Sequence, residues 1–366
     1  MMRPQIAVIV SGFPRTSETF AVNELLALAE RGVLAAVFAT KPGDRGASQP
    51  GCQALLPLVR FLPAGPAAEQ ATAVRRDLAG RRVTGVHAYF AHTPAEVGES
   101  AARLLGVPFG FSVHARDARK VDVSALRARA RRAACVVACN DDVARTLADG
   151  RIHLVPHGVD RARFRPAPPR HATGNSRLLQ LLAVGRLVEK KGFDVLIRAL
   201  AMLRDTTRLR IVGDGPERDR LQRLAADAGV GARVVFAGSC THHELPAEYA
   251  GADVVVVPSV VDKSGDCDGL PNVVLEAMAS ARPVAATAIG AIASAVEHGV
   301  TGLLVEEQSP EALADALRQL AANPDLRFAM GRRGAETVAR RYDLARCTDR
   351  FSALLEAAYA TGTEAR

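Results

Sequence analysis

Residues 253–259 read Asp253-Val254-Val255-Val256-Val257-Pro258-Ser259, a β-branched run that ends in Pro and Ser. A run of this length without polar alternation is typical of a strand that is buried on both faces of a sheet. An acidic loop follows it, and then a helical pattern begins near Pro271. A strand that is covered on both faces and leads into a helix indicates a parallel α/β sheet.

The same alternation of short apolar runs and helical patterns extends through the whole chain. The candidate strands of the first half are Ile6–Val10, Ala35–Ala39, Val86–Phe90, Phe109–Val113, Val136–Cys139 and Ile152–Val155. Those of the second half are Leu178–Val184, Leu209–Val212, Val234–Ala237, Val254–Val257, Val284–Thr287 and Gly302–Val305. The pattern predicts an α/β protein with two doubly wound, Rossmann-like domains.

A Pro-rich segment, residues 164–176, separates the two sets of strands and reads as a linker. We therefore predict an N-terminal domain of residues 1–168 and a C-terminal domain of residues 169–345. Residues 346–366 are predicted to form a final helix, because Phe351, Leu354, Leu355 and Tyr359 recur at helical spacing. This helix can pack against either domain, and packing back on the N-terminal domain is the expectation. Two such domains that face each other bind ligands in the cleft at the carboxyl ends of their strands.

The charge of the chain is unevenly distributed. Residues 1–165 hold 23 Lys and Arg against 14 Asp and Glu, whereas residues 166–366 hold 24 against 25. The densest basic stretch consists of Arg116, Arg119, Lys120, Arg127, Arg129, Arg131 and Arg132. A solvated helix face is the favoured interpretation, and a surface for anionic lipid or a phosphate-bearing acceptor is the alternative. Nucleic acid is not expected as a partner, because aromatic residues make up only 4% of the chain and no recognition motif is present.

The sequence contains no segment that predicts export or membrane insertion. No apolar run approaches the roughly 18 residues of a spanning helix, and the first apolar run is too short for a signal peptide. We expect a cytoplasmic location, with peripheral contact at the inner membrane face through the basic N-terminal domain. The six cysteines include no CxxC pair, so neither a disulfide framework nor a zinc site is expected.

The first motif of the C-terminal half places cations just after a strand. Residues 182–193 put Arg186 past the strand end and Lys191 before Gly192 and the helical residues 193–203. An Arg fork and a Lys point charge can together hold a diphosphate and stabilise it as a leaving group. Exposed surface cations are the alternative interpretation.

The second motif is the turn Gly213-Asp214-Gly215-Pro216, which connects a strand to a helix. Glycines at such a turn allow a ligand to approach the backbone closely. The motif is not the GxGxxG of a dinucleotide site, which argues against an oxidoreductase. A plain tight turn is the alternative.

The third motif carries two carboxylates, Asp268 and Glu276, around the helix that begins near Pro271. The amides and dipole at the start of a helix suit a phosphate, and flanking carboxylates can hold sugar and ribose hydroxyls. An EF-hand is excluded because Leu275 occupies the position of its last ligand. A magnesium cluster of Asp262, Asp266 and Asp268 is an alternative.

Six motifs in order resemble the retaining glycosyltransferases of family 4. They are residues 13–20, residues 112–117, residues 156–160, Gly185-Arg186 with Lys191-Gly192, residues 213–216, and residues 268–276. The likeness runs nearly end to end and is strongest to exopolysaccharide-type enzymes that resemble those of colanic acid synthesis. It implies the two-domain GT-B fold.

The resemblance also implies roles for individual residues. Arg186 and Lys191 would contact the donor diphosphate, Glu276 the donor ribose, and Asp268 the transferred sugar. His114 would lie beside that sugar, and Gly12 would lie where the diphosphate approaches. The acceptor side would be lined by Ser17, Glu18 and Asp117. The other substrate-binding candidates are Gly215 in its turn and Gly269, Leu270 and Asn272 around the start of the helix.

Two stretches depart from the family pattern. Asp268 replaces the usual Glu, which shortens the reach of the carboxylate by one methylene. Residues 289–296 replace the usual Gly-Gly-Ile-Pro-Glu and lack its second glycine, its proline and its glutamate. These departures affect the loops that would contact the donor sugar.

The sequence thus predicts a retaining, hexosyltransferase-type enzyme that uses a UDP- or GDP-sugar. The expected acceptor is a glycan, lipid-linked or small-molecule hydroxyl, with a role in exopolysaccharide or other cell-surface glycan synthesis. No cofactor and no obligatory metal are expected. The alternatives are glycosylation of a specialised metabolite, a nucleotide-sugar epimerase of the same fold, and an inactive nucleotide-sugar-binding partner subunit.

Overall fold

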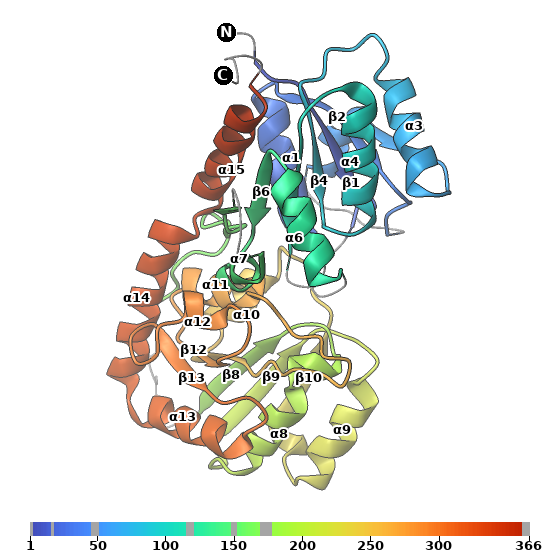
Figure 1. Cartoon of the computed structure of the whole chain (residues 1–366). Coiled ribbons are helices and arrows are strands. Elements are labelled where there is room, and N and C mark those ends of the chain that lie inside the picture. The colour runs from blue at the N-terminus through green and yellow to red at the C-terminus, as the bar shows by residue number, and fades with distance from the viewer. Residues whose placement is uncertain are drawn as a thin grey trace. The chain divides into compact units, whose positions relative to one another are not determined.

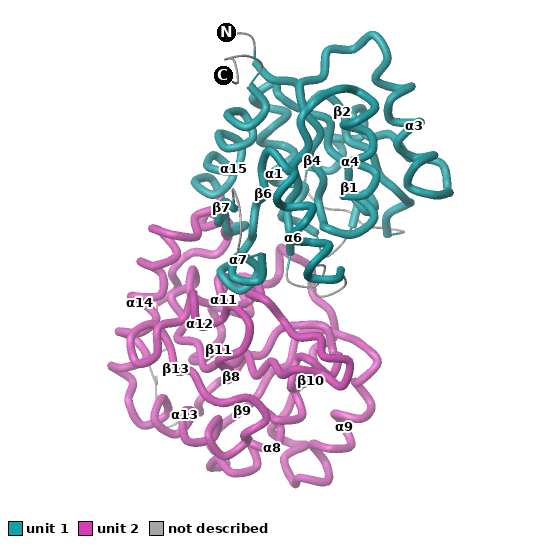
Figure 2. The backbone as a smooth tube through the Cα atoms, in the orientation of Figure 1, with its two compact units in different colours: residues 1–157, 345–366 teal, residues 158–344 magenta. Residues whose placement is uncertain are grey.

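The computed structural model describes residues 3–15, 18–44, 51–114, 121–147, 152–168 and 178–360. The chain forms two compact units, each with its own core (Figure 2). Unit 1 consists of Met1–His157 and Ala345–Arg366, and unit 2 consists of Gly158–Leu344.

Unit 1 is built on a sheet of seven described strands that all run parallel, in the order β3-β2-β1-β4-β5-β6-β7. The strands are β1 (Ile6–Val10), β2 (Leu34–Ala39), β3 (Val59–Phe61), β4 (Gly85–Tyr89), β5 (Phe109–Val113), β6 (Cys135–Ala138) and β7 (Ile152–Leu154). The central strands β1, β4, β5 and β6 are buried along their whole length, which explains why they lack polar alternation.

Helices cover both faces of this sheet (Figure 1). The helices of unit 1 are α1 (Thr19–Glu30), α2 (Cys52–Leu55), α3 (Ala67–Asp77), α4 (Thr93–Leu105), α6 (Val123–Arg132), α7 (Asp141–Leu147) and α15 (Leu344–Ala358), with a 3₁₀ turn at Leu56–Leu58. Ile6, Val8 and Val10 pack towards α1, α2 and α15, whereas Ala7 and Ile9 pack towards α3, α4, α6 and α7. This division follows the two-residue period of a strand.

Unit 2 repeats the architecture with six described parallel strands in the order β10-β9-β8-β11-β12-β13. The strands are β8 (Leu179–Val184), β9 (Thr207–Val212), β10 (Val234–Gly238), β11 (Val254–Val257), β12 (Val284–Thr287) and β13 (Gly302–Val305). The strand order reverses between β8 and β11, and loops that follow such neighbours diverge to leave room for a ligand.

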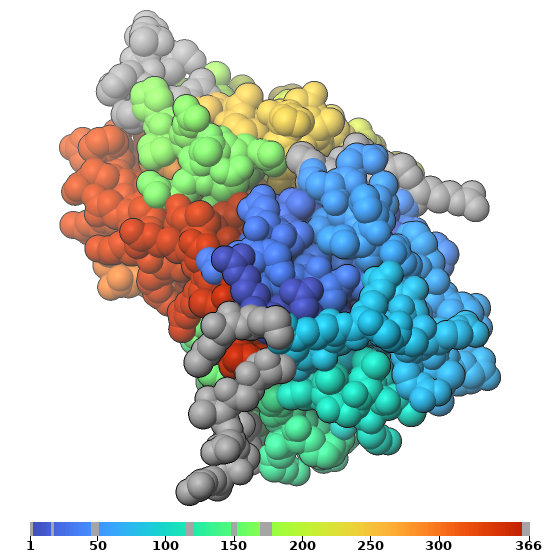
Figure 3. All heavy atoms as spheres, turned by 90° about the horizontal axis from the view of Figure 1, so that it is seen from above, coloured from blue at the N-terminus to red at the C-terminus, as the bar shows by residue number. Residues whose placement is uncertain are grey.

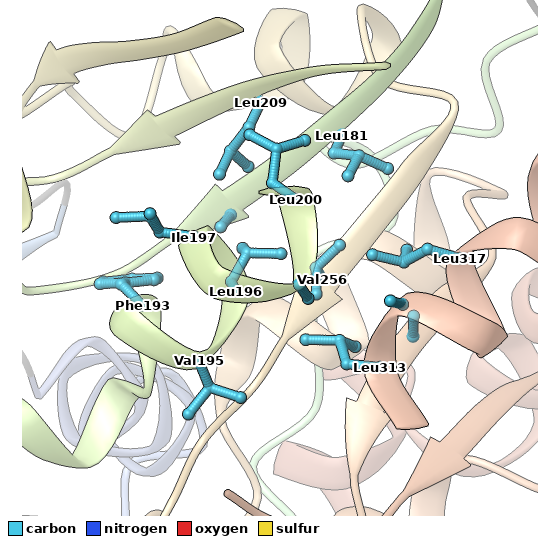
Figure 4. Close-up of a cluster of buried hydrophobic side chains, with 14 of the residues drawn as sticks. Leu181, Phe193, Val195, Leu196, Ile197, Leu200, Leu209, Val256, Leu313 and Leu317 are labelled. Carbon is cyan, nitrogen blue, oxygen red and sulfur yellow. The ribbon is translucent and has the colours of Figure 1, made fainter. Parts of the chain in front are cut away.

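The helices of unit 2 also form two layers. They are α8 (Phe193–Ala201), α9 (Arg218–Asp227), α10 (Leu245–Ala250), α11 (Asn272–Ala279), α12 (Ile292–Ala295), α13 (Pro310–Ala322) and α14 (Pro324–Arg341), with 3₁₀ turns at Glu189–Lys191 and Gly231–Arg233. One face is covered by α8, α9 and α13, and its core includes Phe193, Leu196 and Leu317 packed on Leu181 and Val256 (Figure 4). The other face carries α10, α11, α12 and α14.

The C-terminal helix α15 belongs to unit 1. Arg31 forms ion pairs with Asp349 at 2.6 Å and with Glu356 at 3.2 Å, and Figure 3 shows orange-red C-terminal residues against blue N-terminal ones. Tyr359 is 1% exposed and lies so close to Gly85 that a Cβ at residue 85 would stand 2.1 Å from its ring. Glycine at residue 85 therefore makes the space that the tyrosine fills.

The structure confirms the predicted α/β class and shows two details that the sequence did not indicate. Strand β3 went unrecognised because it has only three residues and lies between prolines at an edge of the sheet. The units divide after His157, whereas the predicted division lies after residue 168, because Val159 and Phe164 pack in the core of unit 2. No helix among the described residues is long and apolar enough to cross a membrane.

Candidate active site

The loops after β8 and β11 carry the cations and carboxylates that the sequence singled out in unit 2. Lys191 donates to Asp268 across a distance of 2.8 Å between Nζ and Oδ2. The hydroxyl of Ser259 donates to the same oxygen at 2.7 Å. Both charged side chains are largely buried, with exposed fractions of 18% for Lys191 and 10% for Asp268. The structure thus brings together two predicted residues and adds Ser259, which the sequence analysis missed.

A second ion pair runs beside the first. Lys190 lies 2.9 Å from Asp266, and it stands 3.8 Å from Asp268. Asp262 accepts from the hydroxyl of Ser264 and from two backbone amides of its own loop. The three aspartates that formed the magnesium alternative are therefore engaged by lysines and by their own loop. No group of three or more potential ligands arranged for a metal ion occurs among the residues that the structure describes.

Arg186 is exposed just after β8, and its side chain makes no hydrogen bond or ion pair with any described residue.

The turn after β9 packs against the same loop. A Cβ at Gly215 would stand 2.4 Å from the carbonyl oxygen of Leu187, and the Leu187 amide donates to the Asp214 carbonyl at 2.9 Å. Only glycine fits at residue 215, because any side chain would collide with the Leu187 carbonyl. The predicted turn therefore packs directly on the loop that carries Arg186.

The loop before α11 is held by its neighbour after β12. The Ala291 amide donates to the Gly269 carbonyl at 3.0 Å, and a Cβ at Gly290 would stand 2.3 Å from the Asp268 carbonyl oxygen. Leu270 packs on the core beneath, and Asn272 is the exposed first residue of α11. The region that departs from the family pattern, residues 289–296, therefore still supports the loop that carries Asp268.

Glu276 lies inside α11 and is only 5% exposed. The hydroxyl of Tyr249, on α10, donates to Glu276 Oε2 at 2.7 Å. Burial raises the pKa of Glu276 to about 7, although the hydrogen bond from Tyr249 lowers it. Tyr249 was not identified from the sequence, because a tyrosine 27 residues away carries no local signal. The pair fixes one oxygen of the carboxylate that was predicted to bind ribose.

Two of the predicted residues of unit 1, Gly12 and His114, lie just after the carboxyl ends of strands. Gly12 follows β1, and a Cβ there would stand 2.9 Å from the Pro42 carbonyl oxygen. Glu18 precedes α1 and lies 3.7 Å from Arg15. Burial raises the pKa of Glu18 to about 7, although Arg15 lowers it. Ser17 and Asp117, the other two predicted acceptor-side residues, lie outside the described residues.

His114 follows β5 and is packed among aromatic rings. Its ring centroid lies 4.8 Å from that of Phe20, 4.7 Å from that of Phe90 and 5.1 Å from that of His157. His114 is 8% exposed. Burial lowers the pKa of His114 well below its ordinary value, and the nearby His157 lowers it further. The ring is therefore neutral at physiological pH.

Behind this stack lies a buried polar cluster that the sequence analysis did not identify. Glu24, on α1, accepts from the Tyr89 hydroxyl at 2.7 Å and from His157 Nδ1 at 2.9 Å. Burial lowers the pKa of His157, but hydrogen bonds with Cys139 and Glu24 raise it to about 10. His157 belongs to a motif that was recognised, whereas Glu24 sits 133 residues away within an ordinary helical pattern.

The described part of the predicted basic stretch lies on or beside α6. Arg129 and Arg132 both pair with Glu99 of α4, at 3.2 and 2.8 Å. Arg127 donates to the Thr146 carbonyl at 3.0 Å. These contacts favour a structural role for this helix face, while Arg116, Arg119 and Lys120 lie outside the described residues.

A cavity of about 690 Å³ lies elsewhere in unit 2, beside Asp253 and Pro283 at the amino ends of β11 and β12. Its arginines are engaged: Arg282 donates to two backbone carbonyls, and Arg332 pairs with Glu336 at 3.0 Å. Ligands of doubly wound sheets bind at the carboxyl ends of the strands. We therefore place the candidate site at the loops after β8 and β11 rather than in this cavity.

Two family models match the chain. Residues 171–337 match the model described as glycosyl transferases group 1, and residues 17–163 match the model described as glycosyltransferase family 4. The first region includes all six described strands of unit 2, and the second includes strands β2 to β7 of unit 1.

Curated proteins and solved structures extend this likeness. The D-inositol 3-phosphate glycosyltransferase 1 of Catenulispora acidiphila is 32% identical over 350 residues, which is 83% of this chain and 82% of that protein. A GDP-mannose-dependent alpha-(1-6)-phosphatidylinositol monomannoside mannosyltransferase of Mycobacterium tuberculosis is 39% identical over 196 residues, 51% of each chain, so the chain spans about half the length of this relative. The structure of Anabaena HepE in complex with UDP has a TM-score of 0.81 at 20% identity and covers 96% of this chain and 100% of its own. The two parallel sheets and these neighbours establish the GT-B fold, and the chain belongs to glycosyltransferase family 4.

Proposed function

We propose that the protein transfers a hexosyl group from a nucleotide-diphosphate sugar to an acceptor hydroxyl, with GDP-mannose as the first donor to test. The observation that carries the proposal is the ion pair of Lys191 and Asp268, which joins the loop after β8 to the loop that leads into α11; Arg186 is an exposed residue of the same loop after β8. The relative whose name specifies GDP-mannose supports the choice of donor.

The donor diphosphate would be held by three groups. Arg186 supplies a bidentate fork, Lys191 a point charge, and α11 the positive end of its dipole with the amides of Asn272 and Val273 at its start. Because Lys191 already pairs with Asp268, the diphosphate competes with this carboxylate for the ammonium group. Glu276 would accept a hydrogen bond from a ribose hydroxyl, with its orientation fixed by Tyr249.

We infer that transfer proceeds with retention of the anomeric configuration. The acceptor oxygen forms a bond to the anomeric carbon on the face from which the phosphate leaves, and the departing phosphate oxygen takes the acceptor proton. Arg186 and Lys191 stabilise the charge that develops on the diphosphate. We also propose that no bound metal is required, which the pairing of Asp266 and Asp268 with lysines supports. Transfer should then survive EDTA.

The proposed acceptor carries a phosphate, as in an inositol phosphate or a phosphoinositol lipid. Support comes from the excess of basic residues in the first half of the chain and from the names of two relatives, which both refer to a phosphorylated inositol. A role in cell-surface glycan or glycolipid assembly would suit such an acceptor better than the exopolysaccharide branch. Contact with an anionic membrane is part of this proposal, and cosedimentation with phosphatidylinositol vesicles tests it.

Calorimetric titration of the purified protein with GDP, UDP and dTDP tests the donor site. We expect one nucleotide to bind and the Arg186→Ala variant to bind it at least about tenfold more weakly, because a charge-assisted fork contributes about 1.5–3 kcal/mol. Arg198→Ala is the matched control, since Arg198 is an exposed arginine on α8 of the same unit. Equal affinities of the two variants would contradict the proposed diphosphate site.

A further inference from the structure

We propose that Glu24 and His157 form a positioning pair for His114, which holds the His114 ring in one orientation at the carboxyl end of β5. The consequence for catalysis rests on the proposed function and on the place beside the transferred sugar that the family resemblance implies for His114. The arrangement of the pair rests on the geometry of unit 1 alone.

Glu24 is a buried carboxylate, and each of its two oxygens forms a hydrogen bond. It is 4% exposed, accepts from the Tyr89 hydroxyl through Oε2 at 2.7 Å, and lies 2.9 Å from His157 Nδ1 through Oε1. No lysine or arginine of the described ranges forms an ion pair with Glu24. A buried carboxylate requires a hydrogen-bonded counter-charge, so the cation of this cluster is the imidazolium of His157.

The fixed imidazolium ring supports one side of His114. The two ring planes differ by only 16° and their centroids lie 5.1 Å apart. Phe20 stacks on His157 at 4.0 Å and also contacts His114 at 4.8 Å. Because Glu24 and Phe20 lie on the same helix, α1 orients His157, and His157 with Phe20 and Phe90 confines His114.

Charge supports the same arrangement. His157 faces Glu24 from α1, Cys139 from the end of β6, and His114; burial lowers its pKa, and the bonds to Cys139 and Glu24 raise it to about 10. His114 faces His157, His87 and His92, and its pKa is lowered first by burial and then by these rings. A positive charge on His157, whose ring centroid lies 5.1 Å away, disfavours a second proton on His114. His114 therefore stays neutral and can exchange a hydrogen bond with a sugar hydroxyl.

Nuclear magnetic resonance of the free protein with ¹⁵N-labelled histidine tests the pair without any substrate. His114→Gln and His157→Gln assign the two rings. In the wild type we expect His157 to remain doubly protonated to above pH 9, as its raised pKa predicts, and His114 to stay neutral where an ordinary histidine takes up a proton, as its lowered pKa predicts. If no histidine ring of the wild type remained doubly protonated above pH 9, the proposal would be overturned, and this result needs no assignment variant.

The Glu24→Gln variant tests the link between the two histidines. We expect the pKa of His157 to fall towards 6.5 and the His114 signals to shift. In contrast, Glu99→Gln, which removes a carboxylate paired with arginines in the same unit, should leave both rings unchanged. An unaltered His157 titration in Glu24→Gln would refute the pair.

Kinetics then separate this inference from the proposed function. Where wild-type transfer is measured, Glu24→Gln should lower kcat by roughly tenfold or more and leave the nucleotide Kd unchanged, because it disturbs His114 and not the diphosphate contacts of unit 2. Unchanged kcat together with the expected histidine titrations would overturn the positioning role. Absence of transfer by the wild type would contradict the proposed function alone, since the titrations still decide the pair.

Discussion

Lys191 and Asp268 form an ion pair of 2.8 Å that joins the loop after β8 to the loop after β11, 77 residues later in the chain. The pair occupies the place where the donor diphosphate is proposed to bind. Asp268 therefore neutralises a lysine that the diphosphate needs. The affinity for the donor depends on the free energy that is required to break the ion pair between Lys191 and Asp268.

Replacing Asp268 with Asn should strengthen nucleotide binding and weaken the fold. The amide can still accept from Ser259, but it leaves the Lys191 charge available to the diphosphate. We expect GDP or UDP to bind up to about tenfold more tightly, which corresponds to about 1.4 kcal/mol. The free energy of unfolding should fall by about 1–3 kcal/mol, because a largely buried ammonium loses its partner. Calorimetry and denaturant titration measure the two effects.

Asp266→Asn is the control for this change. It removes the same charge from the neighbouring pair with Lys190 and leaves the Lys191 pair in place. Equal gains in nucleotide affinity for both variants would show that overall charge, and not the release of Lys191, is responsible.

Replacing Tyr249 with Phe should make nucleotide binding more sensitive to acid. The tyrosine hydroxyl lowers the pKa of Glu276, which burial raises to about 7, so its removal should raise that pKa further. At pH 7.5 more of Glu276 is then protonated, and its interaction with a ribose hydroxyl weakens. Calorimetry from pH 6 to 8.5 should show the midpoint moving to higher pH.

Tyr342→Phe serves as the comparison for Tyr249→Phe, since it removes a hydroxyl that bonds to the Ser294 carbonyl at 3.2 Å in the same unit. The pH profile of this variant should match the wild type. Identical profiles for all three proteins would argue against contact between Glu276 and the nucleotide.

The pair of Glu24 and His157 should make stability depend on alkaline pH. The pKa of His157 is about 10 in the folded chain against an ordinary 6.5, so the folded state binds more protons between these values. The stabilisation is complete below pH 6.5 and is lost as the pH rises through about 10. The thermal midpoint of the wild type should exceed that of Glu24→Gln clearly at pH 6.5 and by less at pH 9.5. A constant difference across this range would contradict the assignment.

Replacing Tyr359 with Phe should loosen α15 from unit 1. The Tyr359 hydroxyl donates to the Val86 carbonyl at 3.1 Å and lies 3.0 Å from His87 Nδ1, and all three groups are buried. Leaving these partners unsatisfied should cost about 1–3 kcal/mol. Faster proteolysis within α15 and a lower thermal midpoint are expected, and an unchanged rate of cleavage would show that the ring alone anchors the helix.

The positions of the strands could be predicted because burial on both faces leaves a direct record in the sequence. Val254–Val257 and Phe109–Val113 are continuous apolar runs, and their bounds in the structure match those expected. Strand β3 leaves no such record, since one of its three residues is exposed. The division after His157 was also missed, because composition marks the Pro-rich residues 164–176 and not the first residues that pack into the second core.

The candidate site was predictable only in part, for a related reason. Arg186, Lys191 and Asp268 lie in recognisable motifs, so their types and places in the chain identify them. The partners Tyr249 and Glu24 lie in helical patterns that contain no motif, and only folding brings them to Glu276 and His157. A sequence motif identifies the residues that face a ligand. The residues that orient those side chains can be identified only from the tertiary contacts of the folded chain.

The most direct test of the central claim is a transfer assay with GDP-mannose, and then UDP-sugars, in the presence of an inositol phosphate acceptor. We predict that nucleotide release depends on the acceptor, that a glycosylated product forms, and that Arg186→Ala loses this activity while Arg198→Ala keeps it. Release at equal rates from both variants, or no release with any donor and acceptor, would contradict the proposed transferase site at the loops after β8 and β11.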